Sequence, residues 1–577
     1  MKKWFTLLLA LMLLPVIALA DGVYTPGTYE ASTPGFGGTI SVSVTVTEDA
    51  IESVVIGENT ESYEIGTLAV ALMPEVIVGG QTLADTVSGA SITANAIIRA
   101  TEDALRQAGA DDAQIALLKS TVPAVEVPQN NETDILVIGA GAAGMGAAIT
   151  AADEGASVIL LEKLDITGGT ARLSGGCIWG PGSKAYTDMQ AVFPDVQLSF
   201  TPEDIMEHIA GYCGVVRNEA LFLNLAKNSP YMLDYAVENG HELMQYLTNS
   251  NQVARPEWRT IVPKYAGAGV AQTLTKMVGE RAIDLRLATE ATRLLTDESG
   301  AVIGAEAVVG GQTYEIKAKK VILATGGFTF NKEMMAQYCE GDYENSVDIA
   351  SVGNTGDGHR MGVEVGGYIV GEGALGITCI GYNPSTNATL WNPFLHVNVK
   401  GEKIMRSDQY YPKVQEIIND QEKGEVYTIY GSDSYNVDTL EGLVARGLLK
   451  KADTIDELAA ALGIDAEGLK ATLDVHNKCA AEGTTDEFGS APASIKPVTQ
   501  GPFYGCRRSA CVMGTIPGLA VDENLKVLRE DGTAIENLYA AGEVMFGNVM
   551  DDLYPMTGTA LALAWTGGRL AVLDALQ

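Results

Sequence analysis

The chain has 577 residues, of which 46% are hydrophobic and 64 are glycine. This composition is typical of a large globular α/β protein with three or four domains, and it excludes a disordered or fibrous chain. The formal net charge of −35 argues against nucleic acid and anionic membranes as partners, because phosphate groups are bound by clusters of lysine and arginine.

The first twenty residues predict export. Lys2 and Lys3 precede an apolar run from Phe5 to Ile17, and small residues then lead to Ala20. A basic start, a short apolar run and a small-residue cleavage site are the three parts of a secretory signal peptide. The run is shorter than the roughly 20 residues that span a bilayer. We therefore expect cleavage near Ala20 and a mature protein that is exported, whether secreted, periplasmic or held at the cell surface.

Residues 21–125 have the pattern of a small α+β domain. Apolar and polar residues alternate from Ile40 to Val46, as in a half-buried strand, and residues 51–56 predict its neighbour. Apolar residues then recur at helical spacing from Ile97 to Leu105. The turn Ser88-Gly89-Ala90-Ser91 precedes this helix, and the free N–H groups of a helix N-terminus favour a phosphate.

A dinucleotide-binding unit follows. The apolar strand 134–138 leads directly into Gly139-Ala140-Gly141-Ala142-Ala143-Gly144, and residues 147–152 predict the helix after it. The next strand, residues 158–161, ends at Glu162. Strand, glycine turn, helix, strand and ribose-binding carboxylate are the context that this fingerprint requires. The sequence therefore predicts a Rossmann-type domain.

Later segments return to the same sheet or depart from it. Residues 320–323 predict another buried strand that ends in the turn Thr325-Gly326-Gly327, and residues 537–541 predict the last strand. Residues 370–500 lose this pattern and contain a helical stretch from Thr454 to His476. We expect them to form an inserted cap.

The cysteines argue against haem and metal. Seven are scattered along the chain, and no two form a Cys-x-x-Cys pair, which a c-type haem, a zinc ribbon or a redox dithiol would need. We expect no metal site and expect the cysteines to be small core residues. Whether Cys506 and Cys511 form a disulfide stays open.

These landmarks resemble the fumarate reductase/succinate dehydrogenase flavoprotein superfamily over almost the whole mature chain. Further matching pieces lie at 168–176, 354–358 and 542–543. The resemblance implies non-covalent FAD, with Glu162 on the ribose and Glu543 near the ribityl chain. It assigns to FAD the residues Gly139, Gly141, Ala143, Gly144, Glu162, Lys163, Gly168, Gly169, Thr170, Ser174, Gly175, Gly176, Thr325, Gly326, Gly327, Asp357, Gly542 and Glu543.

The stretch from Asp85 to Thr93 is similar to the attachment sequence of FMN-binding domains in secreted anaerobic reductases of this superfamily. The resemblance implies covalent FMN, joined through a phosphoester to Ser91 by a flavin transferase. Threonine is usual there, and serine keeps the hydroxyl that forms the ester.

The predicted fold is therefore α/β: a Rossmann-type FAD-binding domain with an inserted α+β capping domain, preceded by a small α+β FMN-binding domain. The predicted boundaries are signal peptide 1–20, FMN-binding domain 21–125, linker 126–133, FAD-binding domain 134–369, capping domain 370–500 and the second part of the FAD-binding domain 501–577.

The substrate pocket departs from the fumarate and urocanate reductases that the chain resembles. Their proton-donating arginine corresponds to Tyr411, residues 511–518 lack their histidine, and residues 548–558 lack their Asn-Arg pair. Charge-assisted bonds are worth about 1.5–3 kcal/mol each. We do not expect fumarate itself to be the substrate.

The replacement motif is similar to the 3-ketosteroid Δ1-dehydrogenase branch, which carries Val-Met-x-x-x-Tyr-Pro-x-x-Gly where this chain has residues 549–558. The resemblance implies that the Tyr554 hydroxyl and the Gly558 N–H hold a ketone oxygen. It also implies that Tyr411 moves a proton at the neighbouring carbon, although Tyr410 could face the flavin instead.

We therefore expect an exported oxidoreductase that acts on CH–CH bonds and passes electrons from FMN through FAD to a C=C bond conjugated to a carbonyl. An apolar, steroid-like enone is the first choice of substrate, and a membrane-associated protein the expected electron donor. An acrylate-type reductase whose cations come from Arg406, Arg507 or Arg508 is the alternative. A steroid-type dehydrogenase and an electron-transfer flavoprotein without a small substrate also stay open.

Overall fold

The computed structural model describes residues 23–35, 38–61, 66–83, 91–120, 127–196, 198, 200–212, 215–247, 260–339, 343, 346–380, 394–409, 411–551 and 554–577. The predicted signal peptide, residues 85–90 of the attachment sequence and Tyr410 lie outside the described residues. The chain forms two compact units, Met1–Val125 and Glu126–Gln577.

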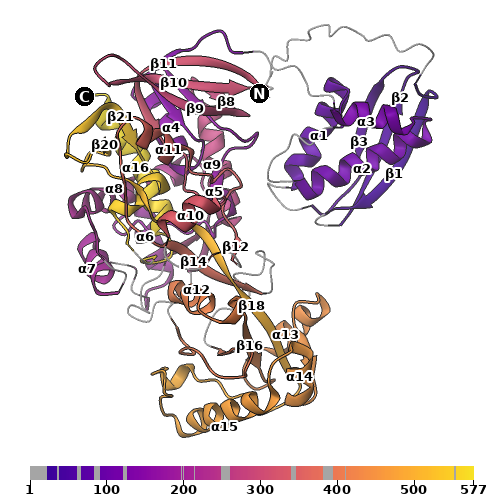
Figure 1. Ribbon diagram of the computed structural model, residues 1–577, viewed down its shortest axis with the longest axis vertical. Coiled ribbons are helices and arrows are strands. Elements are labelled where there is room, and N and C mark those ends of the chain that lie inside the picture. The colour runs from indigo at the N-terminus through magenta and orange to yellow at the C-terminus, as the bar shows by residue number, and fades with distance from the viewer. Residues whose placement is uncertain are drawn as a thin grey trace. The chain divides into compact units, whose positions relative to one another are not determined.

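The first unit is an antiparallel sheet with helices against it (Figure 1). Alternate residues of a strand face the same side, so Ile40, Val42, Val44 and Val46 are all buried, in a core shared with α2. The α+β prediction for this unit is confirmed. Its elements are β1 (Gly27–Pro34), β2 (Thr39–Val46), β3 (Ile51–Ile56), α1 (Gly66–Gly80), α2 (Ser91–Gln107) and α3 (Asp112–Ser120).

The second unit contains the predicted Rossmann-type sheet. In the described part of the chain its strands follow the order β20-β21-β11-β4-β5-β8, and β21, β11, β4, β5 and β8 run parallel. An antiparallel extension, β9 and β10, continues from β11. The bounds are β4 (Glu132–Ile138), β5 (Val158–Leu161), β8 (Ile283–Arg286), β9 (Thr289–Thr296), β10 (Val302–Val309), β11 (Gln312–Leu323), β20 (Lys526–Leu528) and β21 (Ala534–Ala540).

Two helices of this unit, α4 (Ala142–Asp153) and α16 (Thr559–Ala575), approach each other backbone to backbone. A Cβ atom at Gly568 would lie 1.9 Å from the carbonyl oxygen of Ala143, and one at Gly146 would lie 2.5 Å from the Trp565 ring. Glycine is therefore required at both contacts. The close approach keeps the beginning of α16 beside the dinucleotide fingerprint.

The remaining helices of the FAD-binding part surround this sheet (Figure 1). They are α5 (Gly169–Leu173), α6 (Lys184–Val192), α7 (Pro202–Tyr212), α8 (Glu219–Glu238), α9 (Ala266–Gly279), α10 (Lys332–Tyr338) and α11 (Asp357–Glu364). Two short ribbons accompany them: β6 (Leu243–Leu247) with β7 (Ile261–Pro263), and β13 (Ile369–Val370) with β19 (Gly518–Leu519).

The capping part is built on the long strand β18 (Phe503–Thr515), which extends from the cap towards the FAD-binding part (Figure 1). Because β18 belongs to this sheet, the sheet continues past residue 500, where we expected the FAD-binding part to resume. Most residues of β18 are buried, so its sequence looks like that of a strand in the main core. The strands paired with it directly or through β16 are β12 (Val347–Asp348), β14 (Ala374–Ile380), β15 (Leu395–Val397), β16 (Val426–Tyr430) and β17 (Lys450–Ala452).

The helices of the cap are α12 (Tyr411–Asn419), α13 (Val437–Ala445), α14 (Ile455–Leu462) and α15 (Ala466–Glu482). The single helical stretch predicted from Thr454 to His476 is two helices. Gly463 ends α14 in the left-handed conformation, and the Asp465 side chain accepts a hydrogen bond from the Gly468 N–H and begins α15. Glycine after a helix and aspartate before the next are standard stop and start signals.

No helix in the described ranges combines the length and the apolar character that crossing a membrane requires.

Candidate functional site

A cavity of about 840 Å³ opens at the carboxyl ends of the parallel strands. Its wall includes Ile138 and Leu161, the last residues of β4 and β5, and Ala324 and Ala541, which directly follow β11 and β21. Ligands of open α/β sheets bind at this edge. The predicted site residues on the wall are Gly139, Gly141, Ala143, Glu162, Lys163, Gly169, Thr170, Ser174, Gly175, Gly176, Thr325, Gly326, Asp357, Gly542, Glu543, Tyr554 and Gly558.

Three predicted FAD residues, Gly144, Gly168 and Gly327, do not line the cavity. Each is a place where protein atoms meet too closely for a side chain. A Cβ atom at Gly144 would lie 1.7 Å from the Gly139 carbonyl oxygen, and one at Gly327 would lie 2.1 Å from Glu543 Oε1. These glycines allow the segments that form the wall to pack closely together.

The beginning of α4 forms a cradle for a pyrophosphate. Gly141 is the N-cap of α4, and no side chain caps the helix there. A Cβ atom at Gly141 would meet no protein atom within 4 Å, so the space in front of this backbone is open. Unsatisfied N–H groups at a helix N-terminus bind anionic phosphate groups. The fingerprint residues thus fit a dinucleotide.

Glu162 and Lys163 lie at the end of β5, next to this cradle. The Glu162 carboxylate accepts hydrogen bonds from the Ala140 N–H at 2.8 Å and the Leu164 N–H at 3.0 Å, and burial raises its pKa. The Lys163 ammonium lies 2.6 Å from Asp357. The Glu162 carboxylate therefore lies where the fingerprint requires a carboxylate that binds the ribose. Lys163, beside it, is paired with Asp357.

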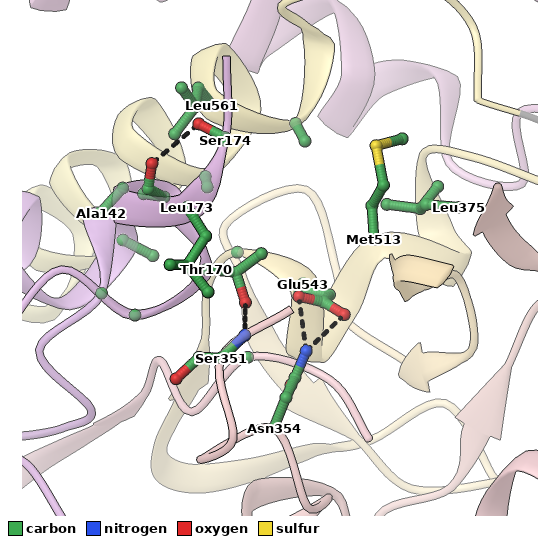
Figure 2. Close-up of a pocket in the computed structure, with 18 of the residues that line it drawn as sticks. Ala142, Thr170, Leu173, Ser174, Ser351, Asn354, Leu375, Met513, Glu543 and Leu561 are labelled. Atoms are coloured by element: carbon green, nitrogen blue, oxygen red, sulfur yellow. Dashed lines mark hydrogen bonds between the residues drawn. The ribbon is translucent and has the colours of Figure 1, made fainter. Parts of the chain in front are cut away.

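Glu543 lies in the middle of the wall. Figure 2 shows its carboxylate facing Asn354, with Leu375 and Met513 on one side and Thr170 and Leu173 on the other. Glu543 accepts hydrogen bonds from the Thr515 N–H at 2.7 Å and from Asn354 Nδ2 at 3.2 Å. Desolvation in the cavity wall outweighs these bonds and raises its pKa to about 7.

Tyr554 and Gly558, the two site residues of the replacement motif, both lie at the beginning of α16, where Gly558 is the N-cap. Tyr554 is buried, and its hydroxyl oxygen accepts the Ala560 N–H at 3.1 Å. Burial raises the pKa of Tyr554 to about 12, although the nearby amides of α16 oppose the shift. The hydroxyl therefore keeps its proton at neutral pH. A protonated phenol and the N-terminus of a helix thus lie together at this end of the cavity.

Three side-chain contacts hold the segment from Asp551 to Thr559 in place. Trp179 Nε1 donates to Thr559 Oγ1 at 3.0 Å, and His208 Nε2 donates to the Pro555 carbonyl oxygen at 3.1 Å. Arg217 forms an ion pair of 2.9 Å with Asp551. The position of Tyr554 is thus fixed by its neighbours in the chain.

For the two other predicted functional residues, Tyr411 and Ser91, the structure describes the backbone but not the side chain. Tyr411 is the first residue of α12, but its side chain lies outside what the structure describes. Ser91 is the first residue of α2 in the other unit, and its side chain is likewise outside the described set. In the same turn Thr93 is buried and donates to the buried carboxylate of Glu61 at 2.6 Å, which anchors the beginning of α2.

The arginines suggested as carboxylate-binding cations do not line the cavity. Arg406 bonds to Asp408 at 3.1 Å, Arg507 lies 3.7 Å from Glu425, and Arg508 is buried in the cap sheet. Sequence reasoning missed Lys496, which lines the cavity together with Phe394 and Tyr435 of the cap. No motif surrounds these residues, so the sequence gives no signal for them.

Comparison with known proteins identifies both units. The family model of the FAD binding domain matches residues 134–561, and that of the FMN-binding domain matches residues 35–106. The predicted fold class and both cofactors are thereby confirmed.

The chain is similar to the urocanate reductase of Eggerthella lenta, with 30% identity over 88% of this chain and 86% of the relative. It is also similar to the structure of a flavocytochrome c3 fumarate reductase in its open conformation, with 26% identity, a TM-score of 0.64 and 78% of each chain covered. The 3-ketosteroid Δ1-dehydrogenase of Sterolibacterium denitrificans has a TM-score of 0.65 over 77% of this chain and 99% of its own, but at 22% identity this likeness shows the fold alone.

Replacing Gly141 by valine should abolish FAD retention without unfolding the protein. The backbone of Gly141 is extended, which valine tolerates, and its side chain would enter the open space in front of α4. Flavin absorbance of the purified variant measures the loss. Gly442→Val in α13, where there is also open space, is the matched control and should keep its FAD. A Gly141→Val protein with full FAD content would show that the pyrophosphate does not bind in front of Gly141.

Glu543 should make the stability of the apoprotein depend on pH. Its folded-state pKa of about 7 lies above the ordinary value of 4.5, so its contribution is fully present below pH 4.5 and is lost as pH rises through 7. The free energy of unfolding should fall by about 3 kcal/mol over this range. Denaturant unfolding between pH 5 and 8 measures it, by comparing the pH dependence of the free energy of unfolding of the native protein with that of Glu543→Gln, which cannot ionise. Identical pH profiles for the two proteins would refute the raised pKa.

Proposed function

Because this chain belongs to the FAD-binding flavoprotein family and carries an FMN-binding domain, we propose that it reduces a C=C bond of the acrylate type, conjugated to a carboxyl group. The relatives named urocanate and fumarate reductase support this choice over a steroid-like enone, which rests on a short motif and a shared fold. The observation that carries the reduction of a conjugated C=C bond is that Tyr554 and the beginning of α16 lie together on the cavity wall.

The chemistry explains why such donors are needed. Hydride addition at the β-carbon of a conjugated alkene leaves negative charge at the α-carbon, and this charge delocalises onto the attached carbonyl or carboxyl oxygen. Preorganised hydrogen-bond donors that face this oxygen stabilise the transition state. The Tyr554 O–H and the Gly558 N–H are donors of this kind, and the beginning of a helix also attracts an oxyanion electrostatically.

A proton must also reach the α-carbon. We assign this step to Tyr411, at the beginning of α12, because a phenol can protonate an enolate carbon directly. Bound FAD would supply the hydride, after receiving electrons from FMN attached to Ser91. Residues 1–20 and the FMN unit together support an exported enzyme that receives its electrons from a membrane-associated donor.

A neutral enone is the second candidate. The donors at Tyr554 and Gly558 carry no formal charge, so they suit a ketone oxygen as well as a carboxylate. Mixing the dithionite-reduced enzyme anaerobically with a panel of acrylates and enones, and following flavin reoxidation, separates the two. Reoxidation by acrylates supports the first proposal, reoxidation by enones alone supports the second, and no response to any alkene would contradict both.

Tyr554→Phe should slow substrate-dependent flavin reoxidation by about 10²–10³-fold, the usual effect of removing one oxyanion donor. Tyr411→Phe should abolish it, because no other group is assigned to protonate the carbon. FAD content should stay normal in both. Tyr539→Phe, which loses a hydroxyl bonded to Asp574 instead of one on the cavity wall, is the matched control. An unchanged rate in either test variant would remove the role assigned to that residue.

Ser91→Ala should remove covalent flavin while leaving FAD in place. In-gel fluorescence of the denatured protein reports the covalent FMN, and the flavin released on denaturation reports FAD. Ser91→Thr, which keeps a hydroxyl, should retain the fluorescent band. A fluorescent Ser91→Ala protein would place the attachment at another residue.

A further inference from the structure

The cap contributes its own face to the cavity, distinct from the face made by the flavin-binding segments. Phe394 precedes β15, Ser434 and Tyr435 follow β16, and Lys496 follows the short turn at residues 492–494. We name Phe394, Tyr435 and Lys496 the cap wall. None of its members belongs to a motif that binds FAD, so the cap wall is available to a second molecule in the same cavity.

Lys496 differs from the other lysine on the cavity wall. The Lys163 ammonium is neutralised by Asp357 at 2.6 Å. The Lys496 ammonium has no hydrogen bond or ion pair to any residue that the structure describes. It is thus a positive charge on the wall without a protein counter-ion.

The backbone of Lys496 is held firmly even though its side chain is exposed. His476 Nε2 donates to the Lys496 carbonyl oxygen at 2.8 Å. Ile495 and Val498, on either side, are 4% and 3% exposed. An anchored backbone with a flexible four-carbon side chain can bring an ammonium group to a ligand inside the cavity.

Phe394 and Tyr435 contribute an aromatic surface to the same cavity wall. Their rings meet edge to face at 5.4 Å, and Phe394 also meets Tyr430 edge to face at 4.7 Å. Contacts of this geometry are favourable for aromatic pairs. The surface can contact a flat, unsaturated group without reorganising.

We propose that the cap wall selects the substrate: Lys496 pairs with its carboxylate, and Phe394 and Tyr435 contact a flat aromatic group. This inference rests on the proposed function and deepens it. The donors at Tyr554 and Gly558 can bond equally well to the oxygen of a ketone and to that of a carboxylate. The selecting charge must therefore come from elsewhere on the wall. In a protein with a net charge of −35, an anionic substrate is otherwise repelled.

The test compares two alkenes that share a styryl group, 3-phenylacrylate and 4-phenylbut-3-en-2-one. Lys496→Met should lower kcat/KM for the acrylate by about 10- to 100-fold, the usual value of one charge-assisted pair, mainly through KM. It should change kcat/KM for the ketone less than twofold. Lys496→Arg should restore most of the acrylate activity. Lys450→Met, which removes the same charge from β17 away from the cavity, is the matched control and should behave like the native protein.

Binding of 3-phenylpropanoate, the saturated acid, provides a measurement that needs no turnover. Its dissociation constant, from perturbation of the flavin spectrum, should rise about 10- to 100-fold in Lys496→Met and stay unchanged in Lys450→Met. If neither alkene is reduced but this difference is found, the proposed function fails and the role of Lys496 stands. Equal losses for acid and ketone, or an unchanged dissociation constant, would overturn the inference.

Discussion

The close contact between α4 and α16 is the constraint on which the site depends. With Gly568 against the Ala143 carbonyl and Gly146 against Trp565, the two helices approach more closely than side chains would allow. The beginnings of both helices consequently face one cavity. The N-terminus of α4 has open space in front of its backbone, where a pyrophosphate can bind, and the N-terminus of α16 lies beside the Tyr554 hydroxyl. In the proposed reaction, the second N-terminus stabilises an oxygen of the substrate by the same electrostatic effect that the first exerts on the cofactor.

Tyr554, which lines the cavity at this second N-terminus, is an uncharged polar side chain. Burial holds Tyr554 in its protonated form and moves the Glu543 titration close to neutral pH. A donor that keeps its proton does not attract a counter-ion in the resting state, so in the proposed reaction its hydrogen can stabilise the charge that develops during reduction. Such a site tolerates several oxygen acceptors, and it discriminates poorly between them without help from another part of the wall.

Local sequence patterns predicted the parts of the molecule that local physics determines. The strand, glycine turn and acidic residue around Gly139 and Glu162 are consecutive in the chain, so periodicity and the glycine positions were sufficient. Tyr554 and Gly558 were identified from the short motif at residues 549–558, in which three residues separate them, and both line the cavity. The split of the long cap helix at Gly463 carried a local signal too, a glycine followed by an aspartate, which the apolar periodicity obscured.

The cap could not be predicted in the same way, because its contribution to the cavity is made by residues far apart in the chain. Phe394, Tyr435 and Lys496 come together only when β15, β16 and the turn after α15 are assembled around β18. The strand β18 is itself buried along most of its length, so its sequence does not reveal that it leaves the main sheet. In the proposed function, substrate selection depends on long-range packing of the cap, whereas the reaction depends on short segments that a sequence displays directly. This division would explain how the motif at 549–558, which resembles that of steroid dehydrogenases, can accompany a wall suited to an anion. We propose that the motif stabilises the developing charge and that the cap selects the molecule that carries it.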